Sequence, residues 1–141
     1  MPASPANSAR NGARPSPHES WLRKHADYQR VYREGKRQAL PLMTYFFAMR
    51  TVADDREASA GPRVGLTAGR VLGNAVARNR IKRRMRAAVR RHRTELTANV
   101  DVILHPRKTV LEAEFSLIER DVLRALRAAQ AAVAGEGFRR R

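Results

Sequence analysis

Arginine and lysine crowd one continuous segment of the sequence, GNAVARNRIKRRMRAAVRRHR at residues 73–93. Nine of its last sixteen residues are Arg or Lys, and no acid occurs anywhere from Ala58 to Thr94. Like charges four residues apart destabilise a helix, so an ordinary solvated helix face mixes charges of both signs. A nucleic-acid backbone removes that repulsion, and the planar guanidinium of Arg suits phosphate groups. The segment therefore predicts a phosphate-binding surface, with a solvated charged face as the alternative.

Few other residues could do chemistry. The sequence holds no Cys, which excludes disulfides, thiolate catalysis and the commonest structural zinc sites. Its four His show no metal-ligand spacing, and His105, beside Pro106, is expected to make a local turn contact. No pair of carboxylates lies near the basic segment, where two-metal hydrolysis would need one. We therefore expect no catalytic residue and no metal held by the protein alone.

The bulk composition agrees with binding to nucleic acid. The 141 residues include 29 Lys and Arg against 13 Asp and Glu, a formal net charge of +16. Acidic membranes and acidic proteins also attract such charge, so its sign alone does not identify the partner. No apolar run approaches the roughly 20 residues that a membrane span needs, and the N-terminus has no apolar core of a secretory signal. We expect a cytoplasmic protein with no membrane partner and no small-molecule substrate.

The elements that must position the basic segment can be predicted from hydrophobic periodicity. They follow the order αβββαβα, which indicates a single α+β domain over residues 21–132. An almost wholly apolar segment, VDVILH, is expected to be a central strand. The Pro- and Ser-rich residues 1–20 are expected to be a disordered extension, and residues 133–141 a flexible basic tail. The expected helices lie in 21–35, 75–97 and 112–132, and the expected strands lie on both sides of Pro41, at 63–68 and at 100–105.

The helix expected at 75–97 has two chemically different sides. At 100° per residue, one stripe is apolar and would face the core: Ala77, Ile81, Met85, Ala88, Val89 and Leu96. The opposite side is polar and basic: Asn79, Lys82, Arg83, Arg86, Arg90 and Arg93. Three more arginines flank the apolar stripe on its other edge: Arg80, Arg84 and Arg91.

A second candidate surface comes from the aromatic residues. Period-two alternation places the apolar side chains of strand MTYFFAM on one face and leaves Phe46 among small groups on the other. Arg63 and Thr67, from the strand RVGLTA, alternate onto a similarly small-residue face. Tyr28 and Tyr32, four residues apart on the first helix, would form a wall beside this floor. Such a cleft suits a flexible nucleic-acid strand, because bases of any sequence stack on aromatic rings. The alternative is that both tyrosines belong to the core, Tyr28 the more buried of the two.

DNA is the less suitable ligand. The run NAVARNRIKRRMR superficially resembles the basic region of a leucine-zipper protein, but no leucine heptads follow it to form a dimer. RNA recognition depends on shape, phosphates and the stacking of unpaired bases, which this combination of residues can supply.

A longer run is also similar to a known family. The segment RVGLTAGRVLGNAVARNRIKRRMRAAVR closely resembles the signature of the bacterial ribonuclease P protein subunit, in which a Gly-Asn-Ala-Val turn precedes an Arg-Asn-Arg motif and a basic helix. DYQRVYREG, VDVILHPRK and FSLIERDVLRALR resemble that family's first helix, last strand and last helix. The resemblance implies an αβββαβα sandwich with a four-stranded mixed sheet and a left-handed βαβ crossover. This fold is similar to the second domain of a small-subunit ribosomal protein.

The resemblance implies a division of labour. In the family, an RNA subunit with Mg²⁺, bound mainly by the RNA, removes the 5′ leader from precursor tRNA, and the protein alone is inactive. The implied partners are that catalytic RNA subunit and precursor tRNA. The resemblance implies that the leader lies in a cleft beside the first helix, where the periodicity argument places Tyr28, Tyr32, Phe46, Arg63 and Thr67. The implied RNA-subunit contacts are Arg78, Asn79, Arg80, Lys82, Arg83 and Arg86, with Arg90 on the same side of the helix.

The chain departs from the family pattern at one place. Two consecutive Lys are usual shortly before the Gly-Asn-Ala-Val turn, and here Gly69 and Arg70 stand there.

Two other function classes stay open at this point. A ribosomal or ribosome-assembly protein could share the charge and size, and a stand-alone nuclease would need metal-binding acids that the sequence does not offer.

Overall fold

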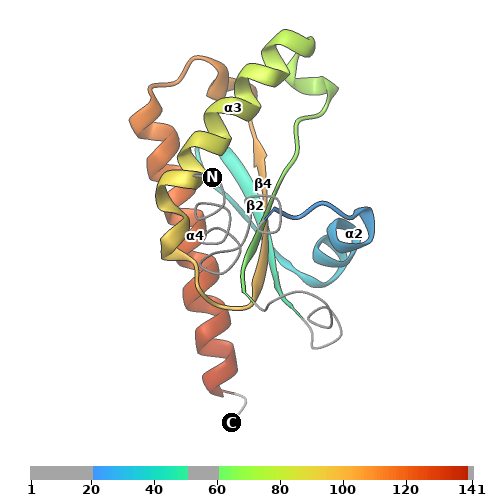
Figure 1. The fold of residues 1–141 in the computed structure, drawn as a ribbon, viewed down its shortest axis with the longest axis vertical. Coiled ribbons are helices and arrows are strands. Elements are labelled where there is room, and N and C mark those ends of the chain that lie inside the picture. Colours follow the sequence, from blue (N-terminus) through green and yellow to red (C-terminus); the bar gives the residue numbers. More distant parts are fainter. Residues whose placement is uncertain (1–20, 51–60, 140–141) are drawn as a thin grey trace, which may run out of the picture.

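The computed structural model describes residues 21–50 and 61–139, with side chains up to residue 134. Three helices and four strands occur in these residues in the predicted order (Figure 1). They are α2 (His25–Glu34), β1 (Lys36–Ala39), β2 (Met43–Met49), β3 (Arg63–Leu66), α3 (Ala75–His92), β4 (Val100–Pro106) and α4 (Phe115–Arg139). Short 3₁₀ turns lie at Arg70–Leu72, Arg93–Glu95 and Lys108–Leu111.

The four strands form one mixed sheet with the order β1-β2-β4-β3. β2 pairs antiparallel with β1 and β4, whereas β3 pairs parallel with β4. The apolar β4 is therefore an inner strand, as predicted. Its register places Ile103 beside Phe46 of β2 and Gly65 of β3. This row crosses the sheet on the face that α2 covers.

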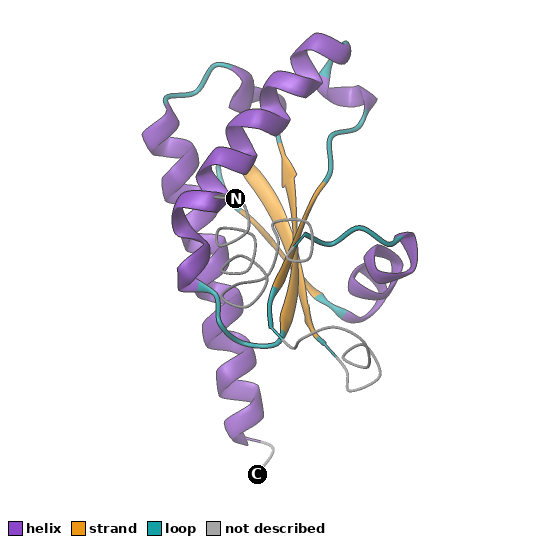
Figure 2. Ribbon diagram, viewed as in Figure 1, coloured by secondary structure: helices purple, strands orange, loops and turns teal. Residues whose placement is uncertain are grey.

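Helices cover both faces of the sheet, α3 and α4 on one side and α2 on the other (Figure 2). The larger core lies under α3 and α4, where alternate residues of β2 such as Met43, Tyr45 and Phe47 meet Ile81 and Leu126. The smaller core under α2 consists of Leu22, Val31, Ala48 and Ile103, with Tyr28 and Phe46 packed against it. The predicted separation of the two faces of β2 is therefore confirmed.

Gly35 ends α2 as predicted, and the reason lies in the packing. Its backbone N–H donates to the carbonyl of Val31 at 2.8 Å. A Cβ at this position would collide with the carbonyl oxygens of Val31 and Phe47. Its φ of −89° is open to any residue, so glycine is required here by the close approach of β2.

Several predicted helix boundaries were wrong. The first helix begins at His25 rather than at residue 21, because Trp21 forms a parallel bridge with Val64 and the N–H of Leu22 donates to the carbonyl of Val64. α3 ends at His92 rather than near 97, because a 3₁₀ turn at Arg93–Glu95 directs the buried Leu96 into the core before β4. The last helix begins at Phe115 rather than near 112, because the preceding residues form the turn at Lys108–Leu111.

The last helix also continues to Arg139, beyond the predicted end at 132. Val133 is 7% exposed and belongs to the larger core. Residues 133–139 are thus part of α4 rather than a separate tail, and Figure 1 shows this helix projecting past the sheet. The predicted disordered extension at 1–20 and the last two residues of the predicted tail lie outside the described residues.

Candidate nucleic-acid interface

A glycine and an asparagine set the start of α3. Gly73 has φ of +120°, in the left-handed region that favours glycine. The side chain of Asn74 accepts a hydrogen bond from the backbone N–H of Ala77 at 2.9 Å, so it caps the helix. Because this turn fixes where the helix begins, it also fixes which side chains point outward.

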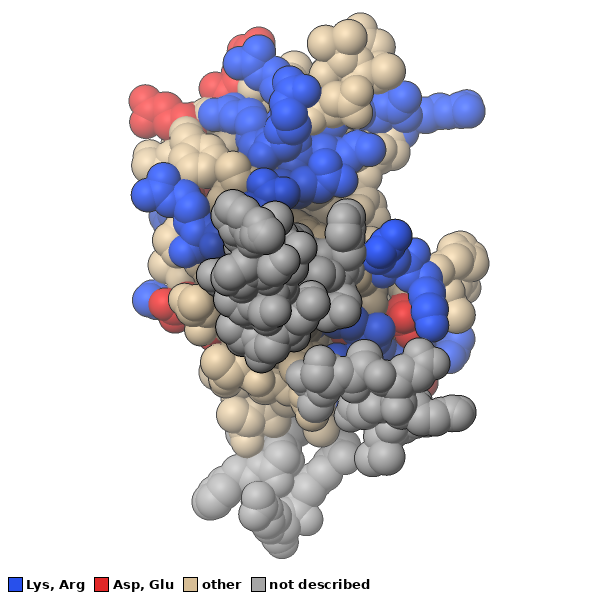
Figure 3. All heavy atoms as spheres, viewed as in Figure 1, with Lys and Arg blue, Asp and Glu red and all other residues tan. Residues whose placement is uncertain are grey.

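The core-facing stripe of α3 is confirmed by its burial. Ile81, Met85, Ala88 and Val89 are fully buried against the sheet and α4. The polar and basic residues that are expected to contact RNA, which we call the basic face, are exposed or half-exposed throughout. Lys and Arg side chains gather over α3 in Figure 3. The basic face comprises Arg78, Asn79, Arg80, Lys82, Arg83, Arg86 and Arg90.

Within the described residues, no cation of the basic face has an ion pair with an acidic side chain. The arginines toward α4 behave differently. Arg84 donates to the carbonyls of Val110, Leu111 and Ala113 at 2.5–3.0 Å, and Arg91 pairs with Glu119 at 3.1 Å. The cations of α3 that have carbonyl or carboxylate partners in the described residues are therefore those on the edge that packs against α4 and the turn before it.

Tyr28 is half-buried and packs against the sheet beside the smaller core. Its hydroxyl donates to the carbonyl of Leu22 at 3.2 Å and accepts from the backbone N–H of Leu66 at 3.1 Å. The ring crosses Gly65, where a Cβ would lie 2.7 Å from the hydroxyl oxygen. Burial raises the pKa of Tyr28. The ring therefore has core contacts, as the alternative expects, and its hydroxyl joins the segment before α2 to the edge strand β3.

Tyr32, Phe46 and His105 form what we call the aromatic cluster. Tyr32 is 39% exposed, and its ring meets Phe46 edge-on at a centroid distance of 5.0 Å. Its hydroxyl is hydrogen-bonded to Nε2 of His105 at 2.9 Å. The rings of Phe46 and His105 also lie 5.0 Å apart. Burial, together with the charge of Arg37, lowers the pKa of His105, so the imidazole is neutral near pH 7.

The prediction that His105 makes only a local turn contact was wrong. His105 lies opposite Thr44 of β2, two positions along the sheet from the Phe46–Ile103 pair. Period-two alternation along VDVILH could have placed it on this face, but only with the register between β2 and β4 known.

A shallow hollow opens beside the aromatic cluster. Its rim carries three cations from two separate segments, and none of the described residues that line it is acidic. The lining residues are Arg37, Thr44, Phe46, Val71, Leu72, His105, Pro106, Arg107 and Lys108.

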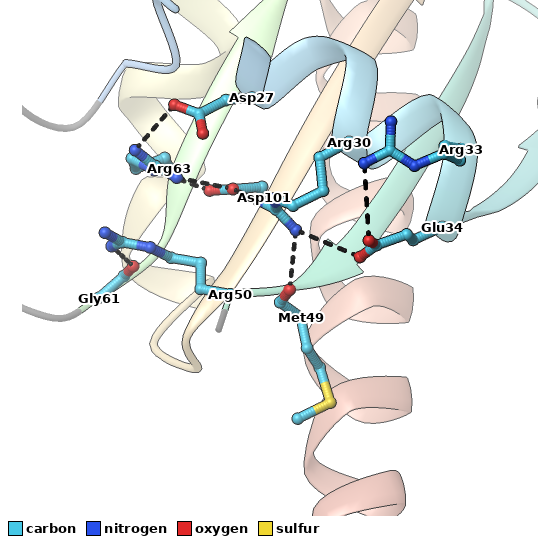
Figure 4. A network of polar contacts seen from close by, with 9 residues as sticks. All are labelled: Asp27, Arg30, Arg33, Glu34, Met49, Arg50, Gly61, Arg63 and Asp101. Atoms are coloured by element: carbon cyan, nitrogen blue, oxygen red, sulfur yellow. Dashed lines mark hydrogen bonds and ion pairs between the residues drawn. The ribbon is translucent and has the colours of Figure 1, made fainter. Parts of the chain in front are cut away.

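Arg63 and Thr67 do not line this hollow. Arg63 donates from Nε and Nη2 to the carboxylate of Asp101, both at 2.8 Å, and its Nη1 lies 3.4 Å from Asp27 (Figure 4). Arg30 of α2 also binds Asp101, which is fully buried. The guanidinium of Arg63 therefore joins α2 to the sheet instead of facing the cleft. Thr67 is half-buried just after β3, and its N–H donates to Leu104 at 3.1 Å.

The described residues bring no three His, Asp or Glu side chains together in a way that could hold a metal ion. In the same part of the chain, no helix is both long and apolar enough to cross a membrane.

Comparison with known proteins identifies the family. The family model described as Ribonuclease P matches residues 17–130. The chain belongs to the ribonuclease P protein family. A ribonuclease P protein component from Brucella melitensis is 36% identical over 110 residues, covering 76% of this chain and 77% of the relative. One from Chloroflexus aggregans is 39% identical over 109 residues, covering 77% and 76%.

Solved structures of ribonuclease P proteins share the fold. The Staphylococcus aureus protein is 27% identical and superimposes with a TM-score of 0.63, covering 79% of this chain and 95% of that one. The Thermotoga maritima protein, at 23% identity, gives a TM-score of 0.64 and supports the fold alone. The predicted resemblance to the ribonuclease P protein family, and the predicted α+β architecture, are thus confirmed.

Proposed function

We propose that this chain is the RNA-binding protein subunit of ribonuclease P, assisting a catalytic RNA in endonucleolytic removal of the 5′ leader from precursor tRNA. The observation that carries the proposal is the basic face of α3, whose cations lack acidic partners within the described residues. A phosphate backbone supplies the missing countercharge, and release of its counterions supplies binding free energy. Membership of the ribonuclease P protein family makes the RNA subunit the partner that fits this face.

The aromatic cluster would bind the leader. Base stacking on an aromatic ring contributes about 1–3 kcal/mol per base and tolerates any sequence. Tyr32 and Phe46 offer such rings on the opposite side of the sheet from α3 and α4. The two surfaces would therefore let one small protein contact two RNAs at the same time.

The chemistry of hydrolysis belongs to the RNA in this proposal. Mg²⁺ bound by the RNA subunit would activate the water and stabilise the departing oxygen. The chain's own residues bind and orient: the basic face positions the RNA subunit, and the aromatic cluster positions the leader relative to the cleavage site. No residue of the chain is assigned a proton transfer.

A decisive experiment uses the full chain purified free of RNA. With precursor tRNA and Mg²⁺ it should show no cleavage, and addition of the RNA subunit should produce 5′ cleavage. Cleavage by the RNA-free protein would contradict the proposal.

The alternative, a ribosomal or ribosome-assembly protein with no role in cleavage, predicts a different bound RNA. Sequencing the RNA that copurifies with the tagged chain separates the two. Enrichment of the ribonuclease P RNA supports the proposal, and enrichment of ribosomal RNA alone contradicts it.

A further inference from the structure

We infer that Arg84 is a positioning residue, which holds the turn at Lys108–Leu111 in place between the two RNA-binding surfaces of the protein. The inference rests on the proposed function, because it concerns how the surface for the RNA subunit and the surface for the leader are kept in register with each other. Arg84 itself contacts neither RNA in this arrangement. It acts through Arg107 and Lys108, at the other end of the turn.

Arg84 holds one side of the turn through three hydrogen bonds from a charged donor. Its Nη1 donates to the carbonyls of Val110 and Leu111 at 2.7 and 3.0 Å, and its Nη2 donates to the carbonyl of Ala113 at 2.5 Å. Such bonds are roughly twice as strong as bonds between neutral groups, and the planar guanidinium presents its nitrogens as a rigid fork. Contacts from two nitrogens therefore fix the orientation of the turn as well as its distance from α3.

The backbone of the turn carries this constraint to the other end. The N–H of Val110 donates to the carbonyl of Arg107 at 3.0 Å, and the N–H of Ala113 donates to the carbonyl of Thr109 at 3.1 Å. The side chain of Val110 is fully buried and anchors the turn at one point. Because a single buried side chain leaves the turn free to rotate about it, the three bonds of Arg84 are what fixes that rotation.

The two ends of the turn lie at different RNA-binding surfaces. Arg107 and Lys108 line the hollow beside the aromatic cluster. At the other end, Leu111 lines a second hollow together with Arg84 and with Arg80 of the basic face. A displacement of the turn would therefore move two cations at the leader surface relative to the helix that binds the RNA subunit.

The carbonyl partners of Arg84 argue against a direct phosphate contact. A phosphate that bound these two guanidinium nitrogens would leave three backbone carbonyls without their donor, which costs free energy that a cation of the basic face would not lose. We therefore expect Arg84 to contribute to the recognition of precursor tRNA without adding a phosphate contact of its own. These two roles differ in what an experiment measures.

The first test compares Arg84→Met with Gln130→Met in the holoenzyme reconstituted from the full chain and the RNA subunit. Gln130 is the matched control, because it also makes three hydrogen bonds to a loop, at Thr97 and Ala98 before β4. The measured quantity is the ratio of the affinities for precursor and mature tRNA. Arg84→Met should lower this ratio about 2- to 30-fold, the range for a residue that acts through a network.

The control should lose thermal stability but keep the wild-type ratio. A wild-type ratio for Arg84→Met, or an equal fall of the ratio for Gln130→Met, overturns the inference, because the effect would then be absent or a general consequence of lost stability. If Arg84→Met does not fold, Arg84→Lys takes its place. Its single ammonium keeps the charge but lacks the fork, so the ratio should still fall by at least about 2-fold, and an unchanged ratio overturns the inference.

A double-mutant cycle tests whether Arg84 acts through the turn. Arg107→Gln and Lys108→Gln together remove the two cations that the turn places at the leader surface. In that background Arg84→Met should cause no further loss of the preference for precursor tRNA, because the side chains that it positions are gone. An undiminished effect of Arg84→Met overturns the inference.

The salt dependence of RNA-subunit binding tests the direct-contact alternative. It should be the same for Arg84→Met and wild type. A log–log slope lower by about 0.7–0.9 would make Arg84 a phosphate contact and overturn the inference.

The wild-type holoenzyme separates this inference from the proposed function. If it binds precursor and mature tRNA equally, the leader-binding part of the proposed function fails, and the inference fails with it. If the wild type prefers precursor tRNA and the Arg84 variants keep that preference, only the inference is wrong.

Discussion

The two tyrosines of α2 show how neighbouring positions on one helix face acquire different roles. Tyr28 and Tyr32 are four residues apart and both face the sheet. Tyr28 lies over Gly65, and its hydroxyl bonds to backbone groups, so its ring is packed in place. Tyr32 lies one turn later, beside Phe46 and His105, and keeps 39% of its surface exposed. A ligand can therefore reach Tyr32 but not the face of Tyr28 that contacts the sheet.

Tyr32→Ala should weaken the affinity of the holoenzyme for precursor tRNA by about 1–3 kcal/mol, the value of one stacked base. Mature tRNA, which has no leader, should bind almost unchanged. The melting temperature of the protein should fall only slightly, because truncation of a buried aromatic residue costs about 3–5 kcal/mol and Tyr32 is partly exposed.

Tyr28→Ala is the matched comparison for this substitution. It should lower the melting temperature more, since it removes a partly buried ring that packs on the smaller core and two hydrogen bonds to the backbone. A steep drop in melting temperature for Tyr32→Ala, or equal loss of affinity for both RNAs, would make Tyr32 a structural residue and leave Phe46 as the main stacking candidate.

His105 should make the stability of the folded protein depend on pH. Its pKa in the folded protein is below the ordinary value of 6.5, mainly because it is buried. Below about pH 6.5 the unfolded chain therefore binds more protons at this residue than the folded protein does, and stability falls as the pH falls. Above that pH the contribution is fully present. Urea unfolding of wild type and His105→Phe at about pH 8 and about pH 5 measures it, and the wild type should lose more stability between the two. Equal losses would show that His105 does not titrate differently in the folded state.

At the scale of elements, α3 divides its cations between two tasks. Arg84 donates hydrogen bonds to backbone carbonyls of the turn at Lys108–Leu111. Arg91 and His92 contact the carboxylate of Glu119 on α4. The cations of the basic face repel one another, and no acidic side chain of the described residues forms an ion pair with them. An anionic ligand that binds this face would stabilise the helix, so binding and local stability would be linked.

Replacing Arg78, Arg80 and Arg83 together by Ala should weaken binding to the RNA subunit and flatten its salt dependence. Each phosphate contact contributes about 0.9 to the log–log slope in duplex regions, so the slope should fall by roughly two to three units. The measurement is a titration of the RNA subunit at several salt concentrations.

The control for this triple variant is Arg120, Arg124 and Arg127 replaced together by Ala on α4, which removes the same charge from a different helix. It should change the slope much less. An unchanged slope for the α3 variant would place its arginines in solvent and support the solvated-face alternative.

At the scale of the whole molecule, the two helical layers are attached to the sheet in different ways. α3 and α4 bury a large apolar surface, whereas α2 rests on a small apolar cluster and on the buried ion network around Asp101. Arg30 and Arg63 converge on Asp101 from α2 and β3, and Arg30 also bonds the carbonyl of Met49 at 3.1 Å (Figure 4). Because Tyr32 is on α2, this network also sets the position of Tyr32 relative to the sheet.

Asp101→Asn should lower the free energy of unfolding by roughly 3–5 kcal/mol, because removal of one partner leaves two mostly buried guanidinium groups without their shared countercharge. Chemical unfolding of the isolated protein measures the loss. Asp27→Asn is the control, since Asp27 makes a single longer contact of 3.4 Å with Arg63, and it should cost much less. Equal stability of Asp101→Asn and wild type would mean that the apolar contacts alone hold α2.

The sequence by itself determined the order of the elements, the two faces of β2, the apolar stripe of α3 and the family. These properties are local, because helix and strand periodicities and a contiguous motif are read from neighbouring residues. The N-cap at Asn74 and the central position of β4 were predictable for the same reason.

Only the tertiary structure decided which side chains share a site. The pairing of β2 with β4 places His105 beside Tyr32, which is 73 positions away in the sequence. The parallel pairing of β3 with β4 places Arg63 next to Asp101, so that the two side chains form an ion pair. The end of the last helix depends likewise on Val133 finding room in the core. Register and packing are set by contacts between distant segments, and these contacts leave no periodic trace in the sequence of either segment.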